Sequence, residues 1–468
     1  MKTYINFIFY ISILLLCFSS CQQNSQNNQD LDSSENNWKA GVARMVITPE
    51  ENMWMAGYAA RTKPAEGKTH DLWVKALALD DGNGNQGVLV TADIIGFSRE
   101  LSKSICNRLQ KEFKLDRKDI ILSSSHTHSC PVCNKNLINI YPPFNKDQLD
   151  QINRYQQFLE EKVVKCVINA LNSTTPAGLS TGIGMARFAV NRRNNMEKDV
   201  LHATVLKGPS DHTVPVIKMS NPDGSTKAIV VGYACHATTL DGLLWSGDYP
   251  GYSQMELEKA YPGSTALFFA GCGGDQNPIP RRSIQLAEQY GSELAAAVIR
   301  VIKEPMNEQK PALETLYNEI ELEFSEPLSM EELREVERNA GQWQAQWAKY
   351  YIEKINRDEV IPEKYPFYPV QSWKLGDQIL VSLGGEVVVD YALRIKKTWG
   401  NDLIIAAYTN DVMAYIPSER VLEEGGYEGN TSMRAYSQPS TWAPGIEERI
   451  ISEVNNQLQT LGREIQGN

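Results

Sequence analysis

The sequence lacks a surplus of positive charge, an internal repeat and a polar linker within its body. Its formal net charge is −11 and its pI is about 5.3. Nucleic acids and anionic membrane surfaces attract basic proteins, so this charge argues against both as electrostatic partners. The length alone is compatible with two or three domains. Because no linker occurs downstream, we expect one large folded domain over residues 38–468.

The sequence also lacks a nucleotide-binding loop and is poor in cysteine. The segment from Gly271 to Pro278 is glycine-rich but contains no lysine, and a phosphate-binding loop of the nucleotide type needs one. Of the eight cysteines, Cys130 and Cys133 have the spacing of a redox motif. A thiolate zinc site would need a second such pair, so a local disulfide or free thiols are the interpretations that remain.

An apolar stretch from Tyr4 to Phe18 lies near the N-terminus and is too short to predict a membrane span. With the small residues before Cys21, it predicts an export signal over residues 1–21. Cys21 is the expected lipid site of a cell-envelope lipoprotein, in the periplasm or on the outer membrane; an ordinary cleaved secretory peptide is the alternative. Residues 22–37 are almost entirely Gln, Asn, Ser and acidic residues, which predicts a disordered tether.

Six short apolar runs, rich in β-branched residues, predict buried strands of an α/β fold. Each run ends in a polar or glycine-rich cluster, and ligands of open α/β sheets bind beyond the carboxyl ends of such strands. We therefore expect these ends to line one crevice. The runs are 87–92, 120–122, 228–234, 265–270, 378–383 and 403–408.

Apolar residues at spacings of three and four predict amphipathic helices between the strands. One series runs from Ile152 to Ala170 and another from Leu286 to Val298. Ser329 and Glu332 have the pattern of a capping box, which predicts a single helix that carries the residues from Leu333 to Tyr350. We interpret the aromatic residues of this helix as packing residues rather than as a substrate platform.

The strongest chemical signal is a pair of histidines directly after a predicted strand, in Ser123-Ser124-Ser125-His126-Thr127-His128. The sequence has only six histidines, and imidazole is the commonest neutral nitrogen ligand of zinc. A second strand end carries His236, and a third carries Glu386 after two glycines that let the backbone bend close to a ligand. Catalytic zinc usually takes three such ligands, so we predict a zinc site of His126, His236 and Glu386. The alternatives are a polar loop for the histidines and a solvated turn for the glutamate.

Three aspartates near these clusters are candidates to accept the other ring proton of a ligand histidine and so to fix its tautomer. They are Asp93, Asp248 and Asp275. Each of them is also a suitable helix cap.

Together these motifs resemble the catalytic N-terminal domain of the neutral/alkaline, non-lysosomal ceramidases. The resemblance begins at Ala40-Gly41-Val42-Ala43 and Gly57-Tyr58-Ala59, continues through both histidine motifs and Gly247-Asp248, and ends at Tyr427-Glu428-Gly429-Asn430-Thr431-Ser432. It covers nearly the whole folded region. It implies an α/β fold in which helices flank a mixed β-sheet.

In that family a zinc ion is held by the first histidine of the pair, the later histidine, a glutamate and a tyrosine. The resemblance assigns these roles to His126, His236, Glu386 and Tyr415. The tyrosine is identified only in this way. The second histidine and a later tyrosine contact the substrate carbonyl and its developing oxyanion, which implies catalytic roles for His128 and Tyr427.

The sequence departs from the family in two places. Where the family has an Asn-Arg-Ser stretch with an essential serine, this sequence has Asn191-Arg192-Arg193. The roughly 35 residues after Ser432 also leave no room for the family's C-terminal immunoglobulin-like domain, which needs about 100 residues. Guanidinium groups suit carboxylate, sulfate and phosphate, so Arg192 and Arg193 are predicted to bind substrate.

The leading hypothesis is an exported zinc-dependent hydrolase, in which metal-activated water attacks a polar substrate such as a uronic-acid or sulfated sugar. One alternative is an amidase that hydrolyses N-acyl sphingolipids. Another is a surface binding lipoprotein without activity. The expected partners are a small-molecule, lipid or oligosaccharide substrate and the membrane that holds the lipid on Cys21, but no nucleic acid.

Overall fold

The computed structural model describes residues 37–133, 136–200 and 202–465. These described residues belong to one compact unit. The predicted export signal, the lipid site Cys21 and all but the last residue of the predicted tether lie outside the described residues, so these assignments stay predictions. Among the described helices, none combines the length and the apolar character that a membrane span requires.

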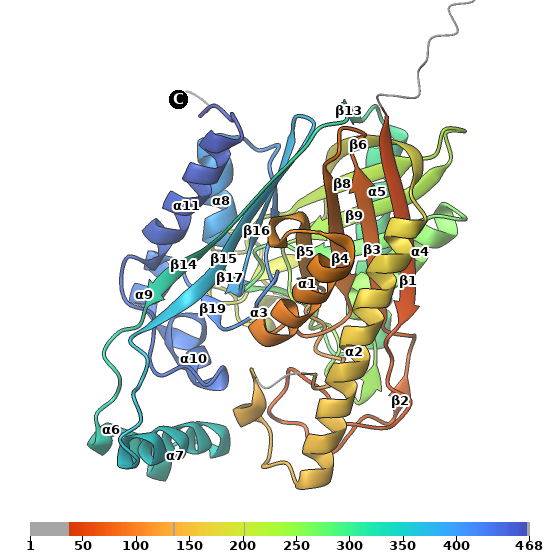
Figure 1. Ribbon diagram of the computed structural model, residues 1–468. Coiled ribbons are helices and arrows are strands. Elements are labelled where there is room, and N and C mark those ends of the chain that lie inside the picture. Colours follow the sequence, from red (N-terminus) through yellow and green to blue (C-terminus); the bar gives the residue numbers. More distant parts are fainter. Residues whose placement is uncertain (1–36, 134–135, 201, 466–468) are drawn as a thin grey trace, which may run out of the picture. The chain divides into compact units, whose positions relative to one another are not determined.

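Two β-sheets form the centre of the compact unit (Figure 1). The order of the larger sheet is β11 (Thr265–Ala270), β9 (Thr226–Tyr233), β8 (Thr213–Ser220), β6 (Thr175–Met185), β1 (Trp38–Val46), β3 (Trp73–Asp80), β4 (Gln86–Ala92) and β5 (Ile120–Ser124), with β13 (Asn307–Gln309) paired to β6. The order of the smaller sheet is β14 (Leu313–Glu323), β15 (Lys364–Leu375), β16 (Gln378–Leu383) and β18 (Ile404–Ala406). Both sheets contain parallel and antiparallel pairs. The mixed α/β fold implied by the sequence is therefore confirmed.

Alternate side chains of the strands fill two hydrophobic cores, because successive residues of a strand point to opposite faces. In β11, Leu267 and Phe269 belong to one core, whereas Phe268 belongs to the other. Trp373 and Leu380 of the smaller sheet also belong to the first core. The two sheets therefore pack face to face around that core, and the second core lies beneath the helices.

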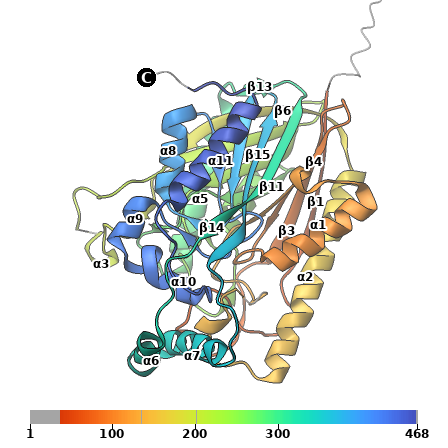
Figure 2. The same ribbon diagram turned by 60° about the vertical axis from the view of Figure 1, so that its left-hand side comes forward.

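Helices cover the outer faces of the sheets (Figures 1 and 2). α2 packs on β1 and β3, beside α1. α4 and α5 pack against each other on the strands near β11. α11 packs on β14 and β15, beside α8. Their bounds are α1 (Arg99–Phe113), α2 (Lys146–Asn172), α4 (Asp248–Ala260), α5 (Ile284–Lys303), α8 (Val389–Trp399) and α11 (Ile446–Thr460). The two predicted amphipathic series lie in α2 and α5, and the series in α2 is buried throughout.

The helix predicted after Ser329 is two helices rather than one. Ser329 caps α6 (Met330–Asn339) with the predicted capping box, but α7 (Gln342–Asn356) starts afresh. Between them Ala340 and Gly341 both adopt extended backbone conformations. Glycine has a low helix propensity, so the chain breaks there, and the apolar spacing that continued across the break was misleading.

The resulting α6–α7 hairpin (Met330–Asn356) has a small hydrophobic core of its own. Leu333, Trp347 and Tyr351 are buried in it. The packing interpretation holds for Trp347, and Trp343 is half-buried against the main core, but Tyr350 is 43% exposed.

All six predicted strands are present, and their carboxyl ends meet in one region. They are β4, β5, β9, β11, β16 and β18. β4 pairs parallel with β5, β9 with β11, and β16 with β18, so the ends of each pair lie together. Beyond β18, the Ala407 N–H donates to the Ala270 carbonyl at 2.8 Å, and the Ser124 N–H donates to the Tyr408 carbonyl at 3.3 Å. The segment after β18 therefore joins the end of β5 to the end of β11.

Short strand pairs attach the following loops to this region. β17 (Glu386–Val387) pairs parallel with β19 (Tyr415–Ile416), which places Glu386 beside Tyr415. β7 (Ala189–Asn191) pairs antiparallel with β12 (Gln276–Pro278). A third pair joins β2 (Gly67–Lys68) to β10 (Leu244–Trp245).

Candidate metal centre

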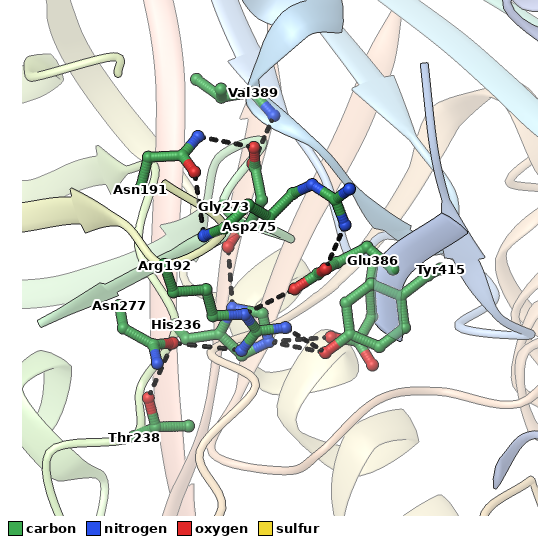
Figure 3. A network of polar contacts seen from close by, with 12 residues as sticks. Asn191, Arg192, His236, Thr238, Gly273, Asp275, Asn277, Glu386, Val389 and Tyr415 are labelled. Atoms are coloured by element: carbon green, nitrogen blue, oxygen red, sulfur yellow. Dashed lines mark hydrogen bonds and ion pairs between the residues drawn. The ribbon is translucent and has the colours of Figure 1, made fainter. Parts of the chain in front are cut away.

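The four side chains predicted to hold a metal ion converge at the strand ends. Nε2 of His236 lies 2.9 Å from Oε2 of Glu386 and 3.2 Å from the phenolic oxygen of Tyr415 (Figure 3). Nε2 of His126 lies 3.1 Å from the same oxygen of Glu386. All four residues are buried. Residues far apart in the sequence thus form one polar cluster inside the protein.

The histidine rings are oriented by backbone carbonyl groups. Nδ1 of His126 lies 2.5 Å from the carbonyl oxygen of Ile95, and Nδ1 of His236 lies 2.7 Å from that of Gly273. A carbonyl oxygen only accepts hydrogen bonds, so both Nδ1 atoms carry the proton. In their neutral forms, the two rings therefore present the lone pairs of their Nε2 atoms to Glu386.

Charge and spacing make this cluster suitable for a cation. Burial lowers the pKa of His236 to about 4, so the ring is neutral near pH 7. Burial works to raise the pKa of Glu386, but contacts with His126 and His236 outweigh it and hold that pKa well below its ordinary value. When both rings are neutral and protonated on Nδ1, two imidazole lone pairs and a carboxylate face one another, and a cation between them would remove their repulsion. The separations of 2.9–3.2 Å are close to those in a tetrahedral site, where bonds of about 2.0 Å put ligands roughly 3.3 Å apart.

His128 is the third member of a histidine group that could hold a metal ion. The ligand atoms of His126, His128 and His236 all lie within 4.8 Å of one another, and Nε2 of His128 lies 3.3 Å from that of His126. Burial holds the pKa of His128 well below its ordinary value. Its Nδ1 is buried and has no hydrogen-bond partner within the described residues. This Nδ1 atom faces Gly57, so Nε2 is the ring nitrogen of His128 that faces the cluster.

The position of the His128 ring depends on Gly57 and Tyr58. Gly57 has φ +97°, and a Cβ added there would lie 2.5 Å from the His128 ring. Only glycine accommodates both the conformation and the close approach. The Tyr58 ring packs at 4.8 Å from the ring of His128. The Gly57-Tyr58 motif therefore forms one wall for the imidazole.

The three candidate aspartates stabilise the loops around the centre instead of the histidine rings. Each carboxylate accepts a hydrogen bond from a backbone N–H group. Asp93 accepts from Trp73 at 2.9 Å, Asp248 from Leu240 at 2.8 Å and Asp275 from Val389 at 2.9 Å. The predicted contact with the rings is therefore wrong, because carbonyl oxygens already occupy both Nδ1 positions. Short aspartate side chains readily satisfy such loop N–H groups. Figure 3 shows Asp275 between Val389 and Asn191.

Cys130 and Cys133 are both buried, and neither forms a disulfide with another described cysteine. Sγ of Cys130 donates to the carbonyl of Thr127 at 3.1 Å, within the loop that carries the histidine pair. No disulfide occurs among the cysteines of the described ranges. Of the two interpretations of this motif, the structure has thiols rather than a disulfide.

The Arg192 side chain contacts the centre directly. Its Nη2 donates to the phenolic oxygen of Tyr415 at 3.0 Å, its Nε to Glu428 at 2.8 Å and its Nη1 to Asn277 at 3.2 Å. Burial acts to lower the pKa of Arg192, but Tyr415 and Glu428 outweigh it and raise that pKa. Arg192 is thus a fixed cation beside the Tyr415 hydroxyl (Figure 3).

Arg193 points to the segment around Tyr427 and is balanced by the acidic residues on either side of that tyrosine. It donates to Glu428 at 2.7 Å, to Glu424 at 3.0 Å and to the carbonyl of Gly425 at 3.0 Å. Its charge is therefore neutralised within the protein. Arg193 lines the same cavity as Arg192, so its predicted contact with substrate stays a prediction, but two carboxylates already balance its charge and leave little attraction for an anionic substrate.

Arg193→Ser is expected to destabilise the protein by about 1–2 kcal/mol while leaving its metal content unchanged. Removing one partner of a buried ion pair costs about 3–5 kcal/mol, but Glu428 keeps its contact with Arg192, so the expected cost is smaller. Chemical unfolding measures it. Arg394→Ser is the control, because that arginine is 36% exposed and exposed pairs contribute less than about 1 kcal/mol. Equal losses in the two variants would contradict the prediction.

A cavity of about 480 Å³ opens beside the polar cluster. Arg192, Asn277, Tyr427, Met196 and Ile279 are among the residues that line it, so its wall is partly charged and partly apolar. Tyr427 is 44% exposed. Loss of hydration raises the pKa of Tyr427 above its ordinary value, so its hydroxyl group is protonated and can donate a hydrogen bond into the cavity.

Sequence reasoning missed Tyr436. Its hydroxyl donates to Oε1 of Glu386 at 2.5 Å, and the residue is buried. No motif marks this tyrosine. Its only signal is its place in the same tyrosine-rich segment as Tyr427.

Comparison with known proteins identifies similar chains. The family model described as neutral/alkaline non-lysosomal ceramidase, N-terminal, matches residues 38–277. Neutral ceramidases of Drosophila pseudoobscura pseudoobscura and Drosophila melanogaster are 22% and 23% identical over 260 and 261 residues, which is 52% of this chain and 36% of each relative. The chain therefore matches only about a third of the length of these curated relatives.

Solved structures share the fold. A crystal structure of neutral ceramidase from Pseudomonas aeruginosa aligns with a TM-score of 0.70 and 16% identity, over 89% of this chain and 73% of that chain. A ceramidase complexed with C2 aligns with a TM-score of 0.71 and 15% identity, over 92% of this chain and 77% of that chain. At such low identity the likeness concerns the fold alone.

Proposed function

The chain belongs to the neutral/alkaline non-lysosomal ceramidase family, and from this membership we propose that it is a zinc-dependent hydrolase that cleaves an N-acyl amide. The relatives named neutral ceramidase support the amide. The observation that carries the proposal is that two imidazole nitrogens, a carboxylate oxygen and a phenolic oxygen converge, with neighbouring atoms 2.9–3.2 Å apart. Such a mixed nitrogen and oxygen set suits zinc.

The residues of the centre have distinct proposed roles. His126, His236, Glu386 and Tyr415 would hold the metal ion. Zinc bound there would activate water and polarise the scissile carbonyl. Tyr427 would donate its hydroxyl hydrogen to the carbonyl oxygen as negative charge develops on it. His128, neutral and beside the cluster, would hold or transfer a proton during the reaction.

Arg192 would keep Tyr415 in place rather than bind substrate. Its guanidinium binds the phenolic oxygen, and Glu428 fixes the guanidinium in turn. Burial and Glu386 raise the pKa of Tyr415 above its ordinary value, and Arg192 opposes this rise by favouring the ionised form, which is the form that binds a metal ion. Glu428 thus acts on the centre through Arg192.

The cavity wall favours a substrate with a polar group next to the scissile bond. Its charged residues are paired with one another, as Arg281 with Glu197 at 3.1 Å and Arg192 with Glu428 at 2.8 Å. Paired charges offer hydrogen bonds but little net positive charge. A neutral, hydroxyl-bearing head group therefore fits this wall better than a uronic-acid or sulfated sugar. A carbohydrate-derived substrate is the second candidate, favoured by the same polar lining.

Removal of the metal is the direct test. We expect about one zinc ion per purified chain, loss of activity on treatment with a chelator and recovery on addition of zinc. A screen of N-acyl sphingoid amides, simple esters and acidic oligosaccharides identifies the bond, and release of fatty acid supports the amide. Full activity without metal would contradict the proposal. A chain that binds no metal and cleaves nothing would instead be a binding protein.

Export is a separate proposal that rests only on residues 1–21. We propose that the protein is a lipoprotein anchored through Cys21. Mass spectrometry of the mature N-terminus tests this, because a diacylated Cys21 supports it and an unmodified N-terminus contradicts it.

A further inference from the structure

We propose that Tyr436 is a positioning residue for Glu386, and that the α6–α7 hairpin holds Tyr436 in place. The inference rests on the metal centre proposed above. It concerns how a ligand carboxylate is oriented, and it links a surface hairpin to the buried centre.

The two oxygens of Glu386 have different partners. Oε2 faces His236 at 2.9 Å and His126 at 3.1 Å, whereas Oε1 accepts the Tyr436 hydroxyl at 2.5 Å. The terminal torsion of a glutamate has a broad, shallow preference, so a carboxylate without a partner on Oε1 could rotate. A hydrogen bond to the second oxygen removes this freedom. Groups that bind ligand carboxylates in this way strengthen metal binding.

Tyr436 itself lies at a turn with an unfavourable backbone conformation. It follows α10 (Ser432–Ala435) and is only 4% exposed. The next residue, Ser437, has φ +60°, in the left-handed region that residues other than glycine rarely adopt. Such a conformation persists only when surrounding contacts enforce it.

The α6–α7 hairpin supplies these contacts. The Tyr351 hydroxyl donates to the carbonyl of Ser437 at 2.7 Å, and the indole Nε1 of Trp347 donates to the carbonyl of Gln438 at 2.8 Å. Both side chains are buried on α7, and α7 contacts α10. Figures 1 and 2 both show the hairpin below α10. Asn139 adds a third contact, from its Nδ2 to Oγ of Ser437 at 2.7 Å.

Tyr436→Phe tests the first half of the proposal. It removes one hydroxyl group and keeps the ring. We expect zinc affinity, measured by competition with a chromogenic chelator, to fall about 10–100-fold, with an altered absorption spectrum of the cobalt-substituted protein. Tyr155→Phe is the matched control, because it removes another buried hydroxyl, which donates to the carbonyl of Ile47 at 2.7 Å. We expect this control to bind zinc as the wild type does.

Tyr351→Phe tests the second half, at a residue that touches neither the metal centre nor the cavity. Because it removes only the contact to Ser437, we expect a smaller loss of zinc affinity in the same direction. It also keeps the proposal testable if Tyr436→Phe does not fold, which circular dichroism would reveal.

The outcomes separate this proposal from the proposed function. Equal zinc affinity of Tyr436→Phe and Tyr155→Phe would overturn the role of Tyr436 while leaving the metal centre intact. A loss in Tyr436→Phe without any loss in Tyr351→Phe would overturn the role of the hairpin. A wild type that binds no zinc would refute both proposals. A wild type that binds zinc but hydrolyses none of the substrates would refute the function alone.

Discussion

His236→Ala is expected to abolish stoichiometric zinc binding and to reduce the rate of hydrolysis by more than about 100-fold. Loss of a group that only orients a metal ligand typically costs about 10–100-fold. His236 contacts both Glu386 and Tyr415, so its loss removes one ligand and disturbs two others. Elemental analysis and initial rates measure the two effects. His202→Ala is the control, because His202 is exposed and carries no motif.

Glu386→Gln tests more directly whether zinc binds at this centre. Glutamine keeps the shape of the side chain but has no negative charge to attract a cation, and its amide NH₂ group donates where the carboxylate accepts. We therefore expect added zinc to stabilise the wild type and to give the Glu386→Gln protein no gain in stability. Thermal unfolding with and without zinc measures both. If His236→Ala keeps its zinc and Glu386→Gln still gains stability from it, the ion is bound elsewhere.

The strands of the fold could be predicted because buried strands leave a local signal. A run such as 265–270 is apolar at every position, and β11 is buried on both faces. Parallel pairing then brings the carboxyl ends of the strands to one edge of the sheet. His126 and His236 each follow a predicted strand, so the rule that ligands bind beyond these ends was enough to predict that the two residues meet. The glycines before Glu386 completed that prediction.

Other features depend on contacts that no local pattern reveals. The break at Gly341 was missed because the apolar spacing continues across it. The three aspartates were assigned to the rings because their chemistry allows it, but carbonyl oxygens of Ile95 and Gly273 lie closer. The partners of Arg193 lie more than 200 residues further along the chain. Only the folded structure shows that its charge is already balanced.

The tyrosines show this limit most clearly. Tyr415 was identified through the family resemblance alone, and its place beside Glu386 comes from the pairing of two very short strands. Tyr436 had no signal, and its orientation depends on a hairpin that lies between β14 and β15 in the sequence. Local sequence thus predicts which strand ends meet, whereas the groups that orient the ligands come from segments far away in the sequence.

Tyr427→Phe is expected to lower kcat about 10²–10³-fold, the typical cost of removing one donor that stabilises an oxyanion. Tyr427 lines the cavity, and its ring lies 5.3 Å from that of Tyr415. The ring is kept in the variant, so substrate binding and zinc content should change little. Steady-state kinetics and elemental analysis measure these quantities.

Tyr350→Phe is the matched control for that variant, because Tyr350 is 43% exposed and Tyr427 is 44% exposed, yet Tyr350 lies on α7 outside the cavity. A fall in kcat with constant KM means that the hydroxyl acts in the transition state rather than in substrate binding. A rise in KM with constant kcat would make Tyr427 a substrate-binding residue and leave charge stabilisation to His128 and the metal ion. Wild-type kinetics in Tyr427→Phe would exclude both roles, and the tyrosine would then be part of the cavity wall only.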